Sequence, residues 1–113
     1  MEYGFESKGN VLEVSLDGRL VASCAEDFKD AMFERLKDSK QIVFNLRKMG
    51  HVDSSGHGAL VSVLQWVNGN GGALKLCCLQ PRPKIVFDIT KVCRIFEIYN
   101  TEEEALAAFS ENS

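Results

Sequence analysis

Short apolar runs alternate with longer amphipathic runs along most of this 113-residue chain, and this alternation limits the folds open to it. The runs 42–46 and 73–79 are apolar at almost every position, as in strands that helices cover. Between and after them, apolar residues recur at the three- and four-residue spacing of helices. Because strands that alternate with helices form a largely parallel sheet, the sequence predicts an α/β fold.

The N-terminal residues predict a β-hairpin that adds an antiparallel edge to this sheet. Apolar and polar residues alternate over 3–5 and 12–16, so one face of each strand would be buried and the other solvated. Residues 8–10 supply the turn, and residues 17–19 would end the second strand. The complete order β-β-α-β-α-β-α-β-α predicts a mixed, mostly parallel sheet of four to five strands with about four helices.

Two of the predicted helices begin with the pattern of a capping box, a hydroxyl residue followed three positions later by glutamate. Ser23 with Glu26 would open the first helix, and Thr101 with Glu104 the last. The second helix is predicted to begin near Ser55. The predicted buried residues of the four helices are Ala25, Phe28, Met32 and Leu36; Ala59, Leu60, Val63, Leu64 and Val67; Val86, Phe87 and Ile89; and Ala105, Leu106, Ala108 and Phe109.

Composition and charge exclude several classes of function. The net charge of −3 leaves no basic footprint for nucleic acid, and the hydrophobic fraction of 45% is enough for one core. No apolar run is long enough to span a membrane, and the acidic N-terminus does not resemble a signal peptide. We therefore expect a single domain over residues 1–113, located in the cytoplasm, without a membrane span or direct contact with nucleic acid.

The spacing of cysteine and histidine predicts neither a metal site nor a disulfide framework. The four cysteines form no C-x-x-C motif, and neither histidine falls at a zinc-finger spacing. We expect Cys24, Cys77 and Cys93 to pack as small hydrophobic residues in a reducing compartment. No cofactor is predicted.

Two junctions between a strand and a helix carry unusual polar residues. In α/β sheets, ligands and partners usually contact the end where strands finish and helices begin. The first junction follows the N-terminal hairpin, and the second follows the apolar strand 42–46. The candidate partner-binding residues at these junctions are Asp17, Gly18, Arg19, Asp53, Ser55, Gly56 and His57.

Several of these residues have a structural interpretation beside the functional one. Asp53 would cap the second helix or orient the serine that follows it, and Gly56 would allow either helix–sheet packing or close approach of a partner. Arg19 would contact a partner or remain in solvent. We expect His57 at the solvated surface and Ser55 to serve as a helix-start hydroxyl.

Together these elements resemble the STAS domain, a family named for sulphate transporters and anti-sigma factor antagonists. The strand 42–46 is followed by Val52-Asp53-Ser54-Ser55-Gly56, which resembles the family's strand–loop–helix element. Leu16-Asp17-Gly18-Arg19-Leu20 resembles its L-x-G-x-L strand end. Pro81 followed by residues 86–90 resembles its third helix. The resemblance covers nearly the whole chain.

The resemblance implies a regulatory binding protein. In stand-alone members, the serine after the aspartate, here Ser54, accepts a phosphate from a partner that is both serine kinase and anti-sigma factor. The unphosphorylated form binds that partner and frees a sigma factor, phosphorylation abolishes binding, and a phosphatase is expected to reverse the modification. A second possibility within the family is a scaffold subunit of a larger signalling complex, not regulated through Ser54.

The chain departs from the family pattern at three positions. His57 stands where the family most often has leucine, and His51 is likewise unusual. Lys91 stands where glycine commonly follows the third helix, so the preferred left-handed cap residue is missing. The two histidines lie beside the predicted contact surface and therefore bear on the identity of the partner.

Two further functions compete with regulation by binding. A hydrolase would use Ser54 or Ser55, but the chain lacks a G-x-S-x-G elbow there, and a histidine two or three residues away rarely reaches triad geometry. A small ligand would occupy a groove near Gly18 and Gly56. We therefore predict that the protein is not an enzyme.

Overall fold

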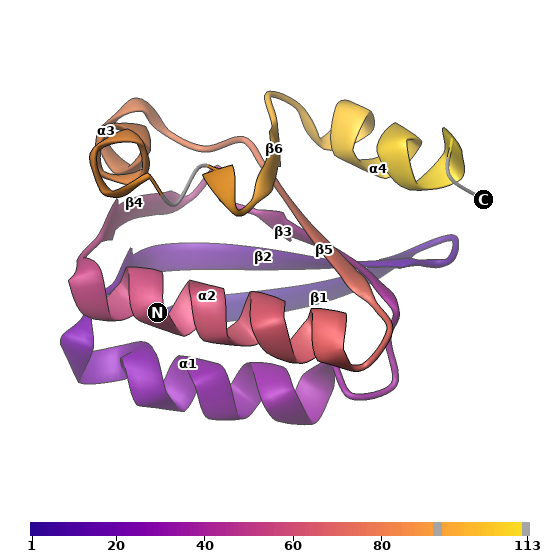
Figure 1. Cartoon of the computed structure of the whole chain (residues 1–113), viewed down its shortest axis with the longest axis horizontal. Coiled ribbons are helices and arrows are strands. Elements are labelled where there is room, and N and C mark those ends of the chain that lie inside the picture. Colours follow the sequence, from indigo (N-terminus) through magenta and orange to yellow (C-terminus); the bar gives the residue numbers. More distant parts are fainter. Residues whose placement is uncertain (92–93, 112–113) are drawn as a thin grey trace.

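The computed structural model describes residues 1–91 and 94–111 and confirms the predicted α/β fold (Figure 1). The strands are β1 (Glu2–Lys8), β2 (Val11–Leu20), β3 (Gln41–Asn45), β4 (Met49–Val52), β5 (Ala73–Cys77) and β6 (Glu97–Tyr99). The helices are α1 (Ala22–Arg35), α2 (Ser54–Gly69), α3 (Pro81–Thr90) and α4 (Glu102–Glu111). The sheet has one strand more than the sequence predicted, because β4 lies in the expected loop between β3 and α2.

Five strands lie in the order β1-β2-β3-β5-β6, and β4 pairs with the end of β2. β1 is antiparallel to β2, whereas the other pairs of described strands are parallel, so the predicted N-terminal hairpin is confirmed. Lys8 pairs with Val11, which leaves the two-residue turn Gly9-Asn10. Gly9 has a φ of 66°, a left-handed conformation that glycine adopts without steric cost.

The second strand changes its partner at Gly18. It pairs with β3 up to Ser15 and with β4 from Gly18 to Leu20, and its register shifts between Gly18 and Arg19. The φ of Gly18 is 122°, a conformation that residues with a side chain rarely adopt. The prediction that residues 17–19 end the strand is therefore wrong, because the glycine permits an irregularity after which the strand continues.

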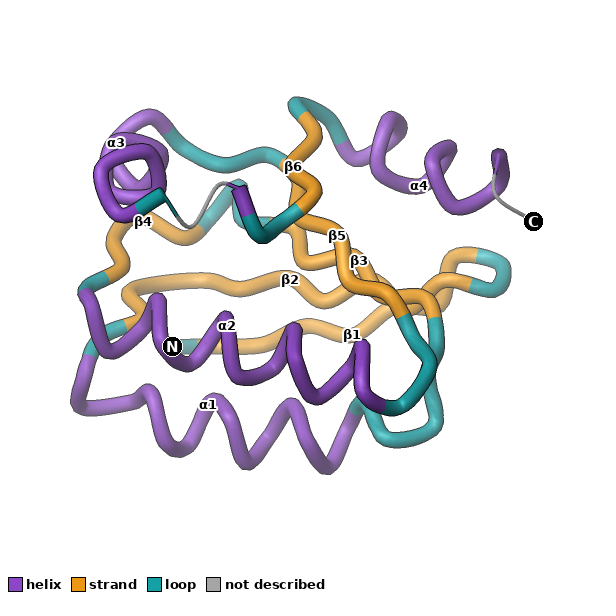
Figure 2. The backbone as a smooth tube through the Cα atoms, viewed as in Figure 1, coloured by secondary structure: helices purple, strands orange, loops and turns teal. Residues whose placement is uncertain are grey.

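Helices cover the two faces of the sheet unequally (Figure 2). α1 and α2 lie side by side on one face, over the larger core, and their predicted buried stripes are confirmed. α4 covers part of the opposite face, where Ala105 and Phe109 are buried and Leu106 and Ala108 are half-buried. The smaller core under α4 consists of Val11, Val43, Cys77, Ala105 and Phe109.

The helix starts agree only in part with the predicted caps. α1 begins at Ala22 after the cap position Val21, so Ser23 lies inside the first turn and makes no capping bond. The predicted capping box at Ser23 is therefore wrong. At α4, the backbone N–H of Glu104 donates to Thr101 Oγ1 at 3.1 Å, and that hydroxyl donates to the Glu104 carboxylate at 3.1 Å. The predicted cap of the last helix by the Thr101 hydroxyl is confirmed, and Glu104 bonds to that hydroxyl.

The third helix buries less than its sequence pattern predicted. Pro83 and Phe87 are its buried residues, Val86 is half-buried, and Ile89 is 73% exposed. The prediction that Val86 and Ile89 belong to the core face is therefore wrong. α3 lies beyond the end of the sheet, next to β4, so only a narrow stripe of its surface meets the core (Figure 1).

The cysteines and the helix lengths bear on two further expectations. Cys77 is buried, Cys24 and Cys78 are half-buried, and these three thiols are free. Cys93 lies outside the described residues. Within residues 1–91 and 94–111, no helix combines the length and the hydropathy needed to cross a lipid bilayer.

Candidate functional site

Asp53 joins the starts of two helices. Its Oδ1 accepts a hydrogen bond from the Gly56 N–H at 2.9 Å, which caps α2. Its Oδ2 accepts the N–H of Ala22 at 3.0 Å, which belongs to the first residue of α1. Backbone N–H groups at helix starts have no intrahelical partner and carry a positive partial charge. The capping interpretation of Asp53 is confirmed, and one carboxylate serves both helices.

These bonds also stabilise the ionised form of Asp53. The pKa of its carboxyl is lowered, first by the hydrogen bond from Gly56; desolvation opposes part of this effect, and the bond from Ala22 lowers the pKa further. Donors that bond to a carboxylate favour its charged state. Asp53 therefore places a fixed negative charge at this junction.

The strands bring the two helix starts to the same place. Leu20 at the end of β2 pairs with Val52 at the end of β4. The Asp53 N–H donates to the Leu20 carbonyl oxygen at 3.2 Å, which continues this pairing by one residue. Each strand is followed within two residues by a helix, so α1 and α2 begin side by side. β4 is thus the element that builds the junction.

Gly56 provides the close approach of α2 to these strands. A Cβ at this position would lie 2.2 Å from the Leu20 carbonyl oxygen and 2.8 Å from Val52 Cγ2. Real Cβ atoms essentially never show such contacts, so a side chain would push the helix away. Gly56 is buried, which supports its packing interpretation rather than direct contact with a partner.

Ser54 and Ser55 are the first two residues of α2, and both are exposed. An enzyme that modifies hydroxyl groups can therefore reach either residue without unfolding the helix. A phosphate at a helix start is favoured by the helix dipole, by about 0.3–1 kcal/mol when exposed. The local structure is consequently compatible with a phosphoserine.

His57 is buried, so the prediction of a solvated histidine is wrong. Its exposed fraction is 4%, and its ring lies 4.5 Å from the Phe87 ring of α3. Neither ring nitrogen has a hydrogen-bond partner among the described residues, and burial lowers the pKa of this imidazole, partly offset by Asp53. The sequence did contain a signal, because His57 precedes Leu60 by three residues and shares the buried face of α2.

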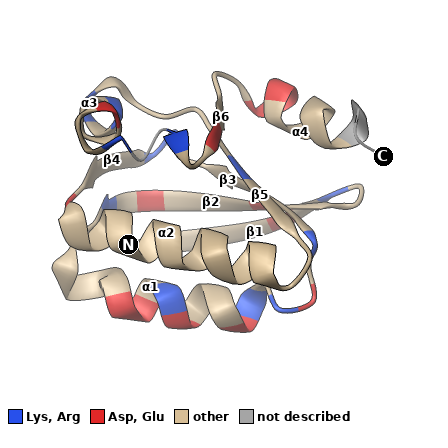
Figure 3. Cartoon of the chain, viewed as in Figure 1, with Lys and Arg blue, Asp and Glu red and all other residues tan. Residues whose placement is uncertain are grey.

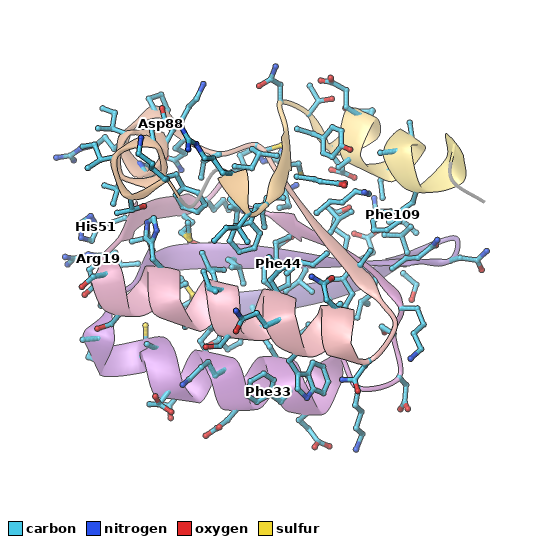
Figure 4. The ribbon with its side chains drawn as sticks, in the orientation of Figure 1. Arg19, Phe33, Phe44, His51, Asp88 and Phe109 are labelled. Carbon is cyan, nitrogen blue, oxygen red and sulfur yellow. The ribbon has the colours of Figure 1, made fainter. Side chains whose placement is uncertain are left out.

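Of the residues predicted at the first junction to contact a partner, Arg19 lies beside the second junction. Arg19 pairs with His51 across β2 and β4, both are exposed, and Figure 4 shows them at the same corner of the molecule. Asp17 is also exposed but lies earlier on β2, opposite Glu2 of β1. The N–H of Gly18 donates to the Lys48 carbonyl at 3.0 Å, so this glycine belongs to the backbone framework.

The arrangement offers little to a hydrolase or a metal. Because the His57 nitrogens are buried without a partner in the described structure, this histidine does not bond to the Ser54 or Ser55 hydroxyl. In residues 1–91 and 94–111, no group of three or more histidine, cysteine, aspartate or glutamate side chains could hold a metal ion. The junction presents hydroxyl groups at a capped helix start.

A family model described as the STAS domain matches residues 4–105 of the chain. The chain belongs to the STAS domain family. A relative of this STAS domain is the anti-sigma F factor antagonist of Paenibacillus polymyxa, which is 27% identical over 108 residues. That match covers 94% of this chain and 92% of the relative.

Solved structures share the fold of this STAS domain. An anti-sigma factor antagonist from Mycobacterium paratuberculosis matches with a TM-score of 0.84 and 20% identity over 95% of this chain and 92% of that chain. The Bacillus cell fate determinant SpoIIAA in its phosphorylated form matches with a TM-score of 0.70 and 20% identity. The latter match covers 96% of this chain and 99% of that chain.

This STAS domain keeps the backbone geometry of a glycine cap without the glycine. Lys91 follows the last residue of α3 and has a φ of 64°, in the left-handed region. Its N–H donates to the Asp88 carbonyl at 3.3 Å. The left-handed cap is therefore present although its preferred residue is missing, and the lysine bears a conformational cost.

Proposed function

We propose that this STAS domain is an anti-sigma factor antagonist that acts by partner switching in the cytoplasm. The unphosphorylated protein binds an anti-sigma factor that is also a serine kinase, and this binding frees a sigma factor. Phosphorylation of Ser54 abolishes the binding, and a phosphatase restores it. The protein catalyses no reaction in this scheme. The family membership and the name of the Paenibacillus polymyxa relative support the proposal.

The observation that carries the proposal is the position of Ser54. It is exposed and directly follows Asp53, whose carboxylate bonds to the first turns of α1 and α2. The serine thus follows a residue that hydrogen bonds hold in place, and it is accessible to a partner. The residues that we propose contact the partner are Asp17, Arg19, Asp53, Ser54 and Ser55, whereas Gly18, Gly56 and His57 position the backbone beneath them.

Charge explains how one phosphate can switch the binding. A phosphoserine adds a charge of about −1.5 to −2 at neutral pH. The helix start tolerates that charge in the free protein, but a closed interface would bury it beside the Asp53 carboxylate. An affinity loss of tenfold requires only about 1.4 kcal/mol. Repulsion and steric conflict at Ser54 are together sufficient for this loss.

Intact-mass and tandem mass spectrometry test the acceptor. The protein is incubated with ATP and a candidate anti-sigma factor kinase from the same genome, beside Ser54→Ala and the matched control Ser55→Ala. We expect a single added phosphate on Ser54 that Ser54→Ala loses and Ser55→Ala keeps. A phosphate on Ser55 would move the acceptor by one residue. No modification by any such kinase would favour the scaffold function instead.

A further inference from the structure

The third helix and the turn after it expose large apolar side chains. Ile85, Ile89 and Ile95 are 58%, 73% and 54% exposed, and they are the exposed large hydrophobic residues of the described chain. Ile85 and Ile89 are four residues apart and therefore share one face of α3. Exposed apolar residues that gather on one element mark interaction surfaces more often than isolated ones do.

The same segment is basic in an acidic chain. Residues 82–94 contain four lysine or arginine residues and one aspartate, which gives a net charge of +3, whereas the whole chain carries −3. Figure 3 shows basic residues on α3 and on the turn before β6, while α4 begins with acidic residues. A partner that fits this segment therefore presents negative charge.

α3 lies next to the junction that carries Ser54. It packs against β4, and its Phe87 ring contacts His57, which is three residues beyond Ser54 on α2. Figure 4 shows Asp88 of α3 at the same end of the molecule as Arg19 and His51. A cleft of about 370 Å³ between α3 and β6, lined in part by Lys84 and Asp88, can receive a side chain from a partner.

We propose that this segment binds the kinase that modifies Ser54. The face of the kinase that contacts it carries negative charge and an apolar groove. The docking surface consists of Arg82, Ile85, Ile89, Lys91, Arg94 and Ile95, and we call it the α3 surface. This inference rests on the proposed function and adds the chemistry of the partner. A phosphate on Ser54 would then repel the acidic face that the α3 surface attracts.

The charges and the location favour this occupant over two others. A symmetric contact with a second copy would place two basic surfaces against each other, which is unfavourable. An anionic bilayer matches the charge and the isoleucines, but it would not make use of the adjoining Ser54 junction. A protein that contacts both α3 and the start of α2 would account for the exposed isoleucines, the positive charge and the neighbouring Ser54 together.

Binding measurements with the kinase that phosphorylates Ser54 test the inference. The unphosphorylated protein is titrated against that kinase by isothermal titration calorimetry at about 50 mM and about 300 mM salt. These concentrations lie below and above physiological ionic strength. We expect Ile85→Ser/Ile89→Ser to weaken binding about tenfold or more. Arg82→Glu/Arg94→Glu should weaken it as strongly at low salt and remove most of its salt dependence.

Lys37→Glu is the matched charge control, because Lys37 is exposed and follows α1, a helix on the other side of the sheet from α3 (Figure 1). It should bind like the natural protein, and all variants should keep its circular dichroism spectrum, since the changed residues are exposed. Normal kinase binding by both double variants, with Ser54 still phosphorylated, would overturn the α3 surface and leave the proposed function intact. Absence of Ser54 phosphorylation by any kinase would overturn both.

Sedimentation with vesicles distinguishes the membrane from the kinase. Vesicles of phosphatidylcholine with and without phosphatidylglycerol are mixed with the natural protein and with Ile85→Ser/Ile89→Ser. We expect no cosedimentation of either protein. Cosedimentation that requires phosphatidylglycerol and the two isoleucines, together with unchanged kinase affinity of the variant, would reassign the α3 surface to a lipid bilayer.

Discussion

At the scale of single residues, Asp53 does two tasks that sequence spacing can suggest only in part. The bond to Gly56 is local and follows from the position of Asp53 before a helix. The bond to Ala22 joins residues 31 positions apart and exists because β2 and β4 end side by side. The sequence therefore predicted the cap of α2 but not the link to α1.

Replacing Asp53 should change how the stability of the protein depends on pH, because both hydrogen bonds favour the ionised carboxylate. Because hydrogen bonds lower the pKa of Asp53 below its ordinary value of 3.8, its stabilisation is present above that value and is lost as the pH falls through the lower folded pKa. We expect Asp53→Asn to lower Tm by several degrees at pH 7, and the difference from the natural protein to shrink only as the pH falls below 3.8 through the lowered folded pKa. Thermal unfolding at pH 7 and at a series of pH values below 3.8 measures this, and a pH-independent difference would contradict it.

Gly56 and Gly58 lie in the same helix but in different surroundings, so the same substitution at each position can be compared. A Cβ at Gly56 would clash with the Leu20 carbonyl oxygen, whereas a Cβ at Gly58 would meet nothing within 4 Å. We expect Gly56→Ala to destabilise the protein by about 3 kcal/mol, since backbone must shift. Gly58→Ala should stabilise it by up to about 1 kcal/mol through helix propensity. Urea unfolding measures both, and equal effects would refute the packing role of Gly56.

At the scale of elements, predictability followed the amount of surface that each element buries. α1 and α2 each press a wide stripe onto the sheet, so their buried residues follow from helical spacing. β4 is four residues long and contains Gly50 and His51, so it carries no strand pattern, and only its pairing with β2 defines it. α3 carries more apolar side chains than its narrow contact with the rest of the protein can bury, which is why Ile89 is exposed.

The end of α3 offers a test of the left-handed cap. The φ of Lys91 is 64°, a region that costs a residue with a side chain about 1–2 kcal/mol and glycine little. We expect Lys91→Gly to stabilise the protein by about 1 kcal/mol in urea unfolding. Lys91→Ala is the control, because it removes the charge but keeps the conformational cost, and it should not stabilise. A gain in both variants would assign the effect to charge.

At the scale of the whole molecule, the second face of the sheet was the part least visible in the sequence. The alternation in β2 predicted that Glu13 would face solvent, but α4 covers that face and Glu13 is 5% exposed. No residue near Glu13 in the sequence indicates that it is buried, because α4 begins 89 residues later, at Glu102. The prediction of a solvated face was therefore wrong where a distant helix returns to the sheet.

Burial of Glu13 should make the stability of the protein fall at higher pH. Its Oε2 accepts the Asn45 amide at 3.1 Å, while Oε1 has no partner in the described structure. Burial raises the pKa of this carboxyl above its ordinary 4.5, and the neighbouring Glu102 raises it further, against the bond from Asn45. The folded protein therefore binds the proton more tightly, and ionisation costs stability as the pH rises from about 4.5 through the folded pKa.

Glu13→Gln removes that cost because the amide stays neutral at every pH. We expect its free energy of unfolding to exceed that of the natural protein by about 1 kcal/mol at pH 8, and the difference to shrink toward pH 4.5, as urea unfolding can measure. Glu34→Gln is the control, since Glu34 is exposed beside Lys37, and it should change little at either pH. A Glu13→Gln difference that is constant with pH would mean that Glu13 ionises freely under α4, and that this helix does not seal the second face of the sheet.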